Sequence, residues 1–467
     1  MSLIYSYIDR KVLFKLAEKY NKSNILGEYK FLLNSDWYSE KQLKSYQNEQ
    51  IHKLVKHCVE NVPYYTKLFA DFGLIPNDIT SRQDLVKLPI LTKQDIRDNY
   101  DQFISKDVDL RKTKMHSTGG STGVPLQFKT DINTWNMAWA STFRAWKWYG
   151  FYLGEKIFTI GGNSLVSKQK ITTKDVFEKY LMRNFKFHSS QMKQSDMKIF
   201  YDSFVKVKPK AVRGYGSTLY VFAKYIKENK LPIPQIKVIL TTGEVLLPEY
   251  RMLLQEVFKA PLYDNYGAGD GGIASHECYM HEGLHITEER CAIEVCDKHG
   301  DLLNDGDIGH VITTDLFNYA FPFIRYQVGD MSYIKKEKCS CGRKSRLFGE
   351  ILGRNGKLLY SKEGVPISPT MLPIMLYPEL NYHKKEYQEL YNKIDRFQIQ
   401  QDKLGDIKIL LKMKQRNDEN SKNYSYIIEN YKNYFSGSKC KLYFVNEIKP
   451  LPSGKEDYVI SNYQHDI

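Results

Sequence analysis

Residues 116–125 have the sequence His116-Ser-Thr-Gly-Gly-Ser-Thr-Gly-Val-Pro125, the most informative stretch of the chain. Glycine lets a loop wrap closely around a ligand, and backbone N–H groups and hydroxyls then offer hydrogen-bond donors to an anion. No Gly-Lys-Ser/Thr sequence ends the stretch, which excludes a P-loop of the Walker type. The stretch predicts a phosphate-binding loop or an ordinary surface loop, and the motifs around it decide between the two.

The composition is that of a globular chain. Its 467 residues, 42% of them hydrophobic, suffice for one large and one small domain or for two or three domains. No run approaches the roughly 20 apolar residues of a membrane span, and the N-terminus shows no cleavage-site pattern. The seven cysteines, an odd number, argue against a disulfide framework. We therefore expect a cytoplasmic protein, whose oligomeric state the composition does not indicate.

The chain is basic, with a net charge of +14 spread thinly over its length. A basic protein can bind nucleic acid, but it can equally bind ATP, coenzyme A or another polyanion. Because the sequence holds no homeodomain, RRM or zinc-finger pattern, we expect small-molecule partners and no nucleic acid. The densest basic cluster, within residues 335–346, is expected to be a solvated face around a turn.

The order of the expected elements is typical of an α/β protein. Residues 1–110 have mainly helical spacing, and residues 131–149 form an aromatic-rich segment that suits a buried helix. Apolar runs that end in glycine turns then alternate with helices, which places ligand groups at the carboxyl ends of strands. The expected strands are 156–161, 235–241 and 261–265, and the helices are 217–229 and 248–258. A β-rich part follows, with strands at 291–296, 310–314 and 323–326.

A domain boundary is expected near Gly353-Arg354. Beyond it we expect strands at 358–360, 396–401, 407–413 and 440–445, and helices at 369–376 and 424–434. That order predicts a small α+β module of about 100 residues. The predicted fold is therefore α/β, with a large multi-layer N-terminal domain of mixed sheets and helices (1–353) and a small α+β C-terminal domain (354–467).

Several motifs stand in one order along the chain. They are Asn61–Tyr65, Leu88–Asp95, Ser117–Pro125, Leu240–Glu244, Tyr263–Asp270, Tyr326–Asp330, Gly353–Arg354 and Leu451–Lys455. The ordered set resembles the adenylate-forming (acyl-CoA synthetase) superfamily, specifically its phenylacetate-CoA ligase-like branch, which includes members from bacterial polysaccharide loci. The resemblance covers nearly the whole chain. It implies that the large domain binds AMP and that the small domain is a lid joined to it by a hinge.

The resemblance implies which residues hold ATP. The phosphates would lie in the loop formed by Ser117, Thr118, Gly119, Gly120, Ser121, Thr122 and Gly123. Thr118 would also take part in catalysis, while Leu126 stands where many relatives have a lysine. Adenine and ribose would lie against Thr242, Gly243 and Glu244, unless these form a plain turn at a strand end. Tyr266 would lie beside adenine, within a motif that also holds Asp264, Asn265 and Gly267.

The resemblance also implies a Mg²⁺ site and a ribose site. The acid that binds Mg²⁺ on the phosphates would be the catalytic residue Asp270 or, if the loop is longer than usual, Glu277. Asp330 would accept hydrogen bonds from both ribose hydroxyls, the alternative being an exposed turn aspartate. Arg354 would reach the ribose or a phosphate at the hinge, although Asn355-Gly-Lys357 replaces the acidic residue that usually follows.

Lys455 resembles the closing lysine of the family and would be catalytic. A lysine on a mobile lid can place one positive charge where a phosphoryl group accumulates negative charge. The alternative is one solvated lysine among the many of this chain. The Pro452-Ser-Gly454 turn directly before it favours the functional interpretation.

Cysteines and histidines form a second constellation. Cys339-Ser-Cys341-Gly-Arg343 puts two thiols on a tight knuckle, and Cys278 precedes two histidines. Two cysteines on a knuckle, with a Cys and a His from an earlier loop, satisfy a tetrahedral Zn²⁺, and some members of the branch show this arrangement. We expect a structural zinc held by Cys278, His285, Cys339 and Cys341. His281 is the substitute for His285, and free cysteines with surface histidines are the alternative.

The implied activity is ATP-dependent activation of a carboxylic acid as an acyl-adenylate, followed by transfer to a thiol, with coenzyme A as the usual acceptor. One alternative is transfer of an acyl or amino-acid group to a sugar amine or a carrier in polysaccharide biosynthesis. Another is a non-catalytic nucleotide-binding protein. The sequence does not identify the acid. Its candidate pocket walls favour an aryl or apolar acid and are the segments 135–148, 158–162 and 213–216.

Overall fold

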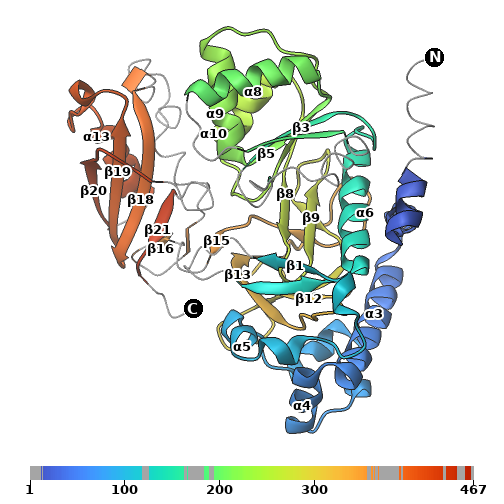
Figure 1. Cartoon of the computed structure of the whole chain (residues 1–467). Coiled ribbons are helices and arrows are strands. Elements are labelled where there is room, and N and C mark those ends of the chain that lie inside the picture. The colour runs from blue at the N-terminus through green and yellow to red at the C-terminus, as the bar shows by residue number, and fades with distance from the viewer. Residues whose placement is uncertain are drawn as a thin grey trace.

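We analysed a computed structural model of the chain. It describes residues 12, 14–117, 126–161, 166, 183–188, 194–354, 359–360, 362, 366–367, 389–390, 393–434, 438–449 and 458–463. Figure 1 shows a large domain with the N-terminal helices along one side and a small C-terminal domain, orange to red, on the other. The expected α/β class and two-part architecture are confirmed. The exact position of the boundary, at residue 353, stays a prediction.

Helices build the first part of the chain. Helix α3 begins at Ser39, whose hydroxyl accepts a hydrogen bond from the Gln42 N–H in a capping box. Gln47 on the same helix donates to the Cys291 carbonyl oxygen (3.1 Å), which ties the helix to the sheet beneath it. The helices are α2 (Ile25–Ser35), α3 (Glu40–Asn61), α4 (Pro63–Asp71) and α5 (Lys93–Asp98), with 3-10 turns η1 (Pro76–Asp78), η2 (Arg82–Lys87), η3 (Tyr100–Phe103) and η4 (Leu110–Lys112).

A five-stranded parallel sheet carries the upper part of the large domain in Figure 1, in the order β4-β3-β5-β6-β7. Strands β3 and β6 are apolar and buried along their whole length, as suits a parallel sheet covered on both faces. Their carboxyl ends meet at the edge where open α/β sheets bind ligands. The elements are β3 (Ile157–Gly161), β4 (Asn184–His188), α8 (Gln194–Val207), β5 (Ala211–Gly214), α9 (Gly216–Glu228), β6 (Val238–Thr241), α10 (Pro248–Phe258) and β7 (Leu262–Tyr263).

Two four-stranded antiparallel sheets form the centre of the large domain, in the orders β14-β10-β9-β8 and β11-β12-β13-β15. They share an apolar core with the N-terminal helices, in which the Tyr65 hydroxyl donates to the Pro322 carbonyl oxygen (3.1 Å). The strands are β8 (Asn265–Ala268), β9 (Ile273–Glu277), β10 (Leu284–Ile286), β11 (Cys291–Cys296), β12 (Gly309–Asp315), β13 (Tyr326–Ser332), β14 (Leu347–Phe348) and β15 (Gly353–Arg354).

Helix α6 (Ile132–Trp148) joins these layers, and its aromatic stripe is buried in part: Phe143 and Trp146 are buried, while Trp135, Trp139 and Trp148 are half-buried. The helix begins at Asp131, whose carboxylate accepts a hydrogen bond from the Thr134 N–H (3.0 Å). It packs against α2 through Met137 and Ala140 and runs beside β9 (Figure 1). The hairpin of β1 (Lys114–Ser117) and β2 (Gln127–Thr130) lies directly before it.

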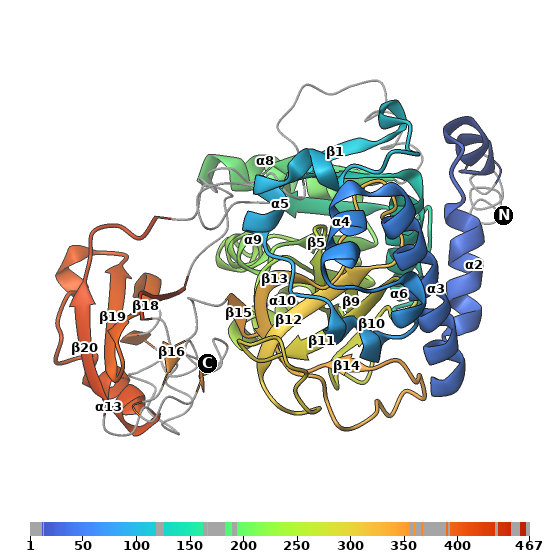
Figure 2. The same cartoon turned by 90° about the horizontal axis from the view of Figure 1, so that it is seen from below.

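The C-terminal domain is a four-stranded sheet, β20-β19-β18-β21, with one helix and a two-stranded ribbon. Burial alternates along β19, so one face of the sheet packs and the other meets solvent. Tyr250 of α10 donates a hydrogen bond to Tyr458 (2.6 Å), a contact between the domains. Figure 2 shows the C-terminal domain beside the large domain from below. The elements are β16 (Leu359–Tyr360), β17 (Pro366–Ile367), β18 (Ile394–Lys403), β19 (Asp406–Met413), η6 (Arg416–Asp418), α13 (Ser425–Tyr434), β20 (Lys439–Phe444) and β21 (Val459–Ser461).

Most of the expected elements are confirmed to within a few residues, but the strand expected at 323–326 is wrong. Strand β13 begins only at Tyr326. The residue before it, Arg325, has a φ of 55°, and this left-handed conformation interrupts an extended backbone. Phe323 and Ile324 are buried in the turn that leads into the strand, and this burial accounts for the apolar run in the sequence. The helix expected at 369–376 lies outside the described residues.

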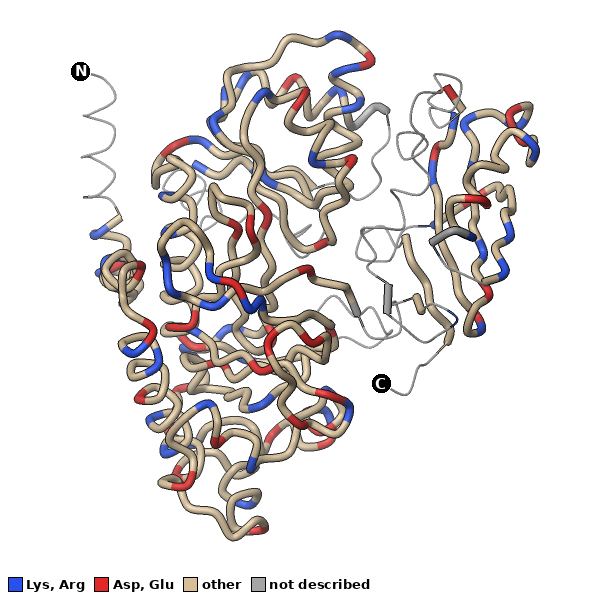
Figure 3. The backbone as a smooth tube through the Cα atoms, turned by 180° about the vertical axis from the view of Figure 1, so that it is seen from behind, with Lys and Arg blue, Asp and Glu red and all other residues tan. Residues whose placement is uncertain are grey.

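Charged residues of both signs are interspersed over the two domains (Figure 3). The expectation of a solvated face at 335–346 is wrong for two of its arginines, because Arg343 is buried and Arg346 pairs with Glu288 (2.7 Å). No helix in the described part of the chain is both long enough and apolar enough to cross a membrane.

Candidate active site and metal centre

The carboxyl edge of the parallel sheet begins the site. Directly after β6, the Thr242 hydroxyl donates to the Asn265 side-chain oxygen (2.5 Å), so two of the predicted nucleotide motifs touch. Gly243 follows with a φ of 79°, which turns the backbone away from the strand. A Glu244 oxygen accepts a hydrogen bond from the Ser217 N–H (3.1 Å) at the start of α9, so this carboxylate also holds a helix N-terminus.

The ribose motif lies against the adenine motif. The Tyr266 hydroxyl donates to Asp330 Oδ2 (2.9 Å), although the two residues lie 64 positions apart in the chain. On the neighbouring strand Arg354 is paired in register with Asp330, so the backbone of the predicted hinge borders the same point. Three predicted nucleotide-binding segments therefore converge on one place.

Asp270 lies in the turn between β8 and β9. The turn requires glycine after it, because Gly271 has a φ of 89° and a Cβ there would lie 2.3 Å from Thr313 Cγ2. The Tyr326 hydroxyl donates to Asp270 Oδ2 (2.8 Å), and Lys93 Nζ lies 3.9 Å from the same oxygen. Burial raises the pKa of Asp270, and the Lys93 charge opposes that shift. An oxygen donor beside the nucleotide motifs suits Mg²⁺.

Glu277, the alternative Mg²⁺ ligand, is committed elsewhere. Both of its oxygens accept hydrogen bonds from Arg251 (2.9 and 3.0 Å), and one also accepts from the Asp264 N–H (2.9 Å). His281 Nδ1 lies 3.0 Å from the other oxygen. These contacts make Glu277 part of the framework and favour Asp270 as the metal-binding acid.

The Asp264 side chain, like that of Glu277, is engaged by neighbouring residues of the fold. Its Oδ1 accepts a hydrogen bond from the Thr241 hydroxyl (2.7 Å), and burial raises its pKa to about 6. This placement does not support the predicted side-chain contact between Asp264 and the nucleotide. Its neighbours Asn265, Tyr266 and Gly267 lie on β8 at the converging point.

The phosphate loop is described only at its base. Ser117 ends β1 opposite Gln127, so the loop starts at the tip of this hairpin. Phe128 of the hairpin packs edge-to-face on Phe323, with the ring centroids 5.4 Å apart. A Cβ on Gly269 would lie 3.9 Å from the Phe128 ring. The base of the loop therefore adjoins the Asp270 turn. The predicted residues outside the described part are Thr118, Gly119, Gly120, Ser121, Thr122, Gly123 and Lys455, and the side chain of Arg354 is likewise not described.

A small cavity of about 30 Å³ opens beside the converging motifs. Its residues come from α6 and from the carboxyl edge of the sheet: Thr142, Trp146, Tyr149, Arg213, Leu240, Thr241, Tyr263, Asn265 and His276. The Tyr149 and Tyr263 rings stack at 3.9 Å and form an aromatic wall. Two of the expected pocket segments, 135–148 and 213–216, thus contribute to one cavity.

Four predicted metal ligands come together behind β9. One donor atom from each of Cys278, His285, Cys339 and Cys341 lies within 4.8 Å of all the others, and all four residues are buried. Cys278 Sγ lies 3.5 Å from Cys339 Sγ, and Cys341 Sγ lies 3.4 Å from His285 Nε2. In a tetrahedral zinc site with bonds of about 2.3 Å, the ligand atoms lie roughly 3.8 Å apart. The donor set therefore fits Zn²⁺.

The histidine ambiguity is resolved in favour of His285. Its Nδ1 contacts the Ser345 hydroxyl (2.9 Å), which leaves Nε2 facing the sulfurs. His281 instead stacks on Tyr263 (5.3 Å) and lies apart from the cluster.

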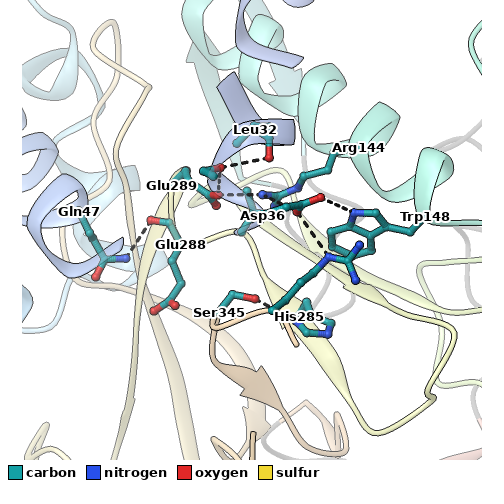
Figure 4. Close-up of polar contacts among 12 residues, drawn as sticks. Leu32, Asp36, Gln47, Arg144, Trp148, His285, Glu288, Glu289 and Ser345 are labelled. Atoms are coloured by element: carbon teal, nitrogen blue, oxygen red, sulfur yellow. Dashed lines mark hydrogen bonds and ion pairs between the residues drawn. The ribbon is translucent and has the colours of Figure 1, made fainter. Parts of the chain in front are cut away.

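A buried charge network supports the cluster (Figure 4). Arg144 donates to Glu289 Oε1 (2.8 Å) and to the Thr287 hydroxyl (3.0 Å). Asp36 accepts a hydrogen bond from Trp148 Nε1 (2.8 Å) and lies 3.7 Å from Arg144 Nη1. Burial raises the pKa of Asp36, and the Arg144 charge opposes that shift. The network ties α2 and α6 to the strand that carries His285.

Sequence reasoning did not identify Lys93, Tyr326 and His276 as site residues. Lys93 lies within the motif Leu88–Asp95, and Tyr326 is the first residue of the ribose motif. Their positions in these motifs could have identified both as site residues. His276 gave no such signal. It reaches the cavity because β9 pairs with β8, where His276 lies opposite Asn265.

Comparisons with known proteins test the resemblance. A family described as CapK C-terminal domain matches residues 379–462. The chain is 25% identical over 433 residues to Protein CapK of Staphylococcus aureus, which covers 89% of this chain and 88% of that protein. It is 26% identical over 339 residues to a phenylacetate-coenzyme A ligase of Pseudomonas putida, covering 71% and 74% of the two chains. The inferred resemblance is confirmed.

The fold also matches solved structures. A 2-hydroxyisobutyryl-CoA ligase, crystallised in the postadenylation state in complex with R3-HIB-AMP, superposes with a TM-score of 0.71 at 16% identity and 88% coverage of both chains. At this identity the match concerns the fold alone.

Proposed function

We propose that this chain, a homologue of CapK and of the phenylacetate-CoA ligases with the fold of adenylate-forming ligases, is an AMP-forming acid–thiol ligase. The observation that carries the proposal is the Tyr266–Asp330 hydrogen bond (2.9 Å), with Arg354 in register beside it. It brings the adenine, ribose and hinge motifs to one place at the carboxyl edge of the sheet. Activation of acids by ATP is the chemistry that unites the named ligase relatives.

In the first step, an oxygen of the substrate carboxylate attacks the α-phosphate of ATP and pyrophosphate leaves, which gives the acyl-adenylate. This step needs positioning and charge neutralisation more than an acid or a base. The hairpin loop with Thr118 would hold the phosphates and Asp330 the ribose hydroxyls. Mg²⁺ held by Asp270 would neutralise phosphate charge. Lys455 would add a positive charge from the C-terminal domain.

In the second step, a thiol sulfur attacks the acyl carbonyl, AMP leaves and the thiol proton passes to solvent. We propose coenzyme A as the acceptor, because the phenylacetate relatives are named coenzyme A ligases. The C-terminal domain would rotate about residues 353–354 between the steps, so that Lys455 acts only in the first. Gly353 has a φ of 86°, a conformation that suits a hinge glycine.

We also propose that the Cys278–His285–Cys339–Cys341 cluster binds a structural Zn²⁺. The four donors are buried and close on one another, with no position left among them for a substrate. The metal would fix the knuckle against β10 and stay outside the chemistry.

ATP–pyrophosphate exchange with a panel of carboxylic acids tests the proposed function. We expect exchange that depends on both an acid and Mg²⁺. ATP binding without exchange for any acid would overturn the activity and favour a nucleotide-binding protein without catalysis.

Lys455→Ala sharpens the test, with Lys441→Ala on an exposed strand position of the same domain as the control. Loss of one charge that stabilises the transition state costs about 10²–10³-fold in rate. We expect that loss in adenylate formation, while thiolysis of a preformed adenylate stays nearly intact. Equal loss in both steps would contradict the assigned role.

The resemblance to a branch with members from bacterial polysaccharide loci leaves a second candidate acceptor, a sugar amine or a carrier in polysaccharide biosynthesis. Supplying either coenzyme A or an amino sugar to the enzyme-bound adenylate separates the two candidates. AMP release that responds only to the amine would replace the thiol as acceptor.

A further inference from the structure

Arg213 is half-buried at the small cavity, and no carboxylate of the described residues pairs with it. Its guanidinium forms no hydrogen bond or ion pair with any described residue, and burial lowers its pKa. A cationic side chain that is shielded from water without a partner is costly, and proteins normally pair such groups. An anion supplied by a ligand would remove that cost.

Three other arginines of the large domain are paired with carboxylates. Arg144 pairs with Glu289 (2.8 Å), and Arg325 pairs with Glu294 (3.1 Å). Arg251, which lies beside the same strands as the cavity, pairs with Glu277 (2.9 Å). Arg213 departs from this pattern, and it does so beside the small cavity.

The cavity adjoins the proposed adenylate site. Two of its lining residues, Leu240 and Thr241, directly precede Thr242, and a third, Asn265, bonds Thr242 and precedes Tyr266. An acyl group attached to the α-phosphate of a nucleotide held by these motifs would extend from there into the cavity. Arg213 would then face the far end of the acyl group and not the carboxylate that reacts.

Another residue of the cavity lining, His276, offers a second donor. His276 Nδ1 accepts a hydrogen bond from the Asn265 amide (3.1 Å), which places the ring proton on Nε2. Among the described residues that buried Nε2 atom has no hydrogen-bond partner. The stacked Tyr149 and Tyr263 rings close the cavity on another side, and its volume of about 30 Å³ suits a compact group.

From this arrangement we propose that Arg213 selects a small carboxylic acid that bears a second oxyanionic group, such as a dicarboxylate. The inference rests on the proposed function. It replaces the expectation of an aryl or apolar acid, because the cavity presents a cation and an imidazole donor between its aromatic walls. The guanidinium would take the second carboxylate in paired hydrogen bonds, with His276 Nε2 as an added donor.

Matched acids test the proposal in the exchange assay: malonate against propionate, and succinate against butyrate. A site built to bond a charged group rejects the analogue that lacks it. We expect kcat/KM to be at least about tenfold higher for the dicarboxylate of each pair, since charge-assisted hydrogen bonds contribute that much or more. Equal rates, or preference for the monocarboxylates or for phenylacetate, would overturn the proposal.

Arg213→Met and Arg213→Lys locate the preference. Arg213→Met should lower kcat/KM for dicarboxylates by about 10–100-fold and change the monocarboxylates little, while Arg213→Lys should retain part of the preference. Arg111→Met is the matched control, because its side chain is 90% exposed and is not among the residues that line the cavity. An equal loss for both acid classes would assign Arg213 to the reacting carboxylate or to folding, against the proposal.

Binding provides a readout that does not need catalysis. Calorimetric titration of malonate into the wild-type protein, with AMP present, should give an affinity that Arg213→Met reduces and Arg111→Met does not. Suppose that no acid supports ATP–pyrophosphate exchange, while malonate still binds through Arg213. The proposed function then fails and the inference on the cavity stands. If propionate supports exchange while malonate neither supports exchange nor binds, the proposed function stands and the inference on the cavity fails.

Discussion

Burial lowers the pKa of His276 to about 3, and the charges of Arg144, Arg290 and Arg213 add to that shift. Arg144 has complementary partners: Glu289 and Thr287 accept its hydrogen bonds, and Asp36 lies 3.7 Å away. Around Arg213 the described residues provide a cavity instead. A buried charge that is paired serves the fold, while one that faces empty space indicates a ligand.

The largest expected effect concerns the paired side, where the Cys/His cluster adjoins the Arg144 network. Structural zinc contributes on the order of 10 kcal/mol in isolated zinc-finger peptides. We expect Cys339→Ser with Cys341→Ser to abolish stoichiometric zinc and to lower stability more than any other change considered. Metal analysis and thermal unfolding check this, with Cys440→Ser as a buried cysteine outside the cluster. Fully folded wild-type protein without metal would rule the site out.

The next effect separates the two arginines directly. Arg144→Met leaves Glu289 buried without its partner, which should cost about 3–5 kcal/mol of unfolding free energy. Arg213→Met removes a half-buried charge that has no partner among the described residues, so stability should change by less than about 1 kcal/mol or increase. Chemical denaturation of both variants measures the difference. Similar losses in the two variants would mean that Arg213 has a counter-charge within the fold.

The smallest effect concerns the nucleotide side of the comparison. Asp330→Asn removes the charge proposed to accept the ribose hydroxyls, and hydrogen bonds to charged groups contribute about 1.5–3 kcal/mol. The dissociation constant of AMP should therefore rise about 10–100-fold in a calorimetric titration. Asp305→Asn, at an exposed loop position, is the control. An unchanged affinity would leave Asp330 as a framework residue bound to Tyr266.

Much of the site was predictable because its residues stand in motifs. Asp270, Asp330 and the four Cys/His ligands were all expected, and the structure brings the metal ligands together and places both aspartates at the converging strands. The choices between Asp270 and Glu277, and between His285 and His281, could not be made in the same way. Each pair is chemically equivalent in sequence, and only neighbouring strands decide which member faces the site.

The motif alone does not show how the side chain of Asp264 is engaged. Asp264 stands in the adenine motif, but its side chain accepts a hydrogen bond from Thr241 (2.7 Å) inside the framework. The strand expected at 323–326 failed for a related reason. An apolar run indicates burial, but the buried residues can lie in a strand or in a turn. Here they lie in a turn, because Arg325 with its φ of 55° is not extended.

The sequence by itself determined the α/β class, the order of the nucleotide motifs and the donor chemistry of the Cys/His cluster, because periodicity and residue type are local properties of a chain. Only the tertiary structure decided that Glu277 is engaged by Arg251, that Arg144 is paired and that Arg213 borders a cavity. The reason is physical: whether a charge is compensated depends on groups tens to hundreds of residues away, which strand pairing and helix packing bring within a few ångströms.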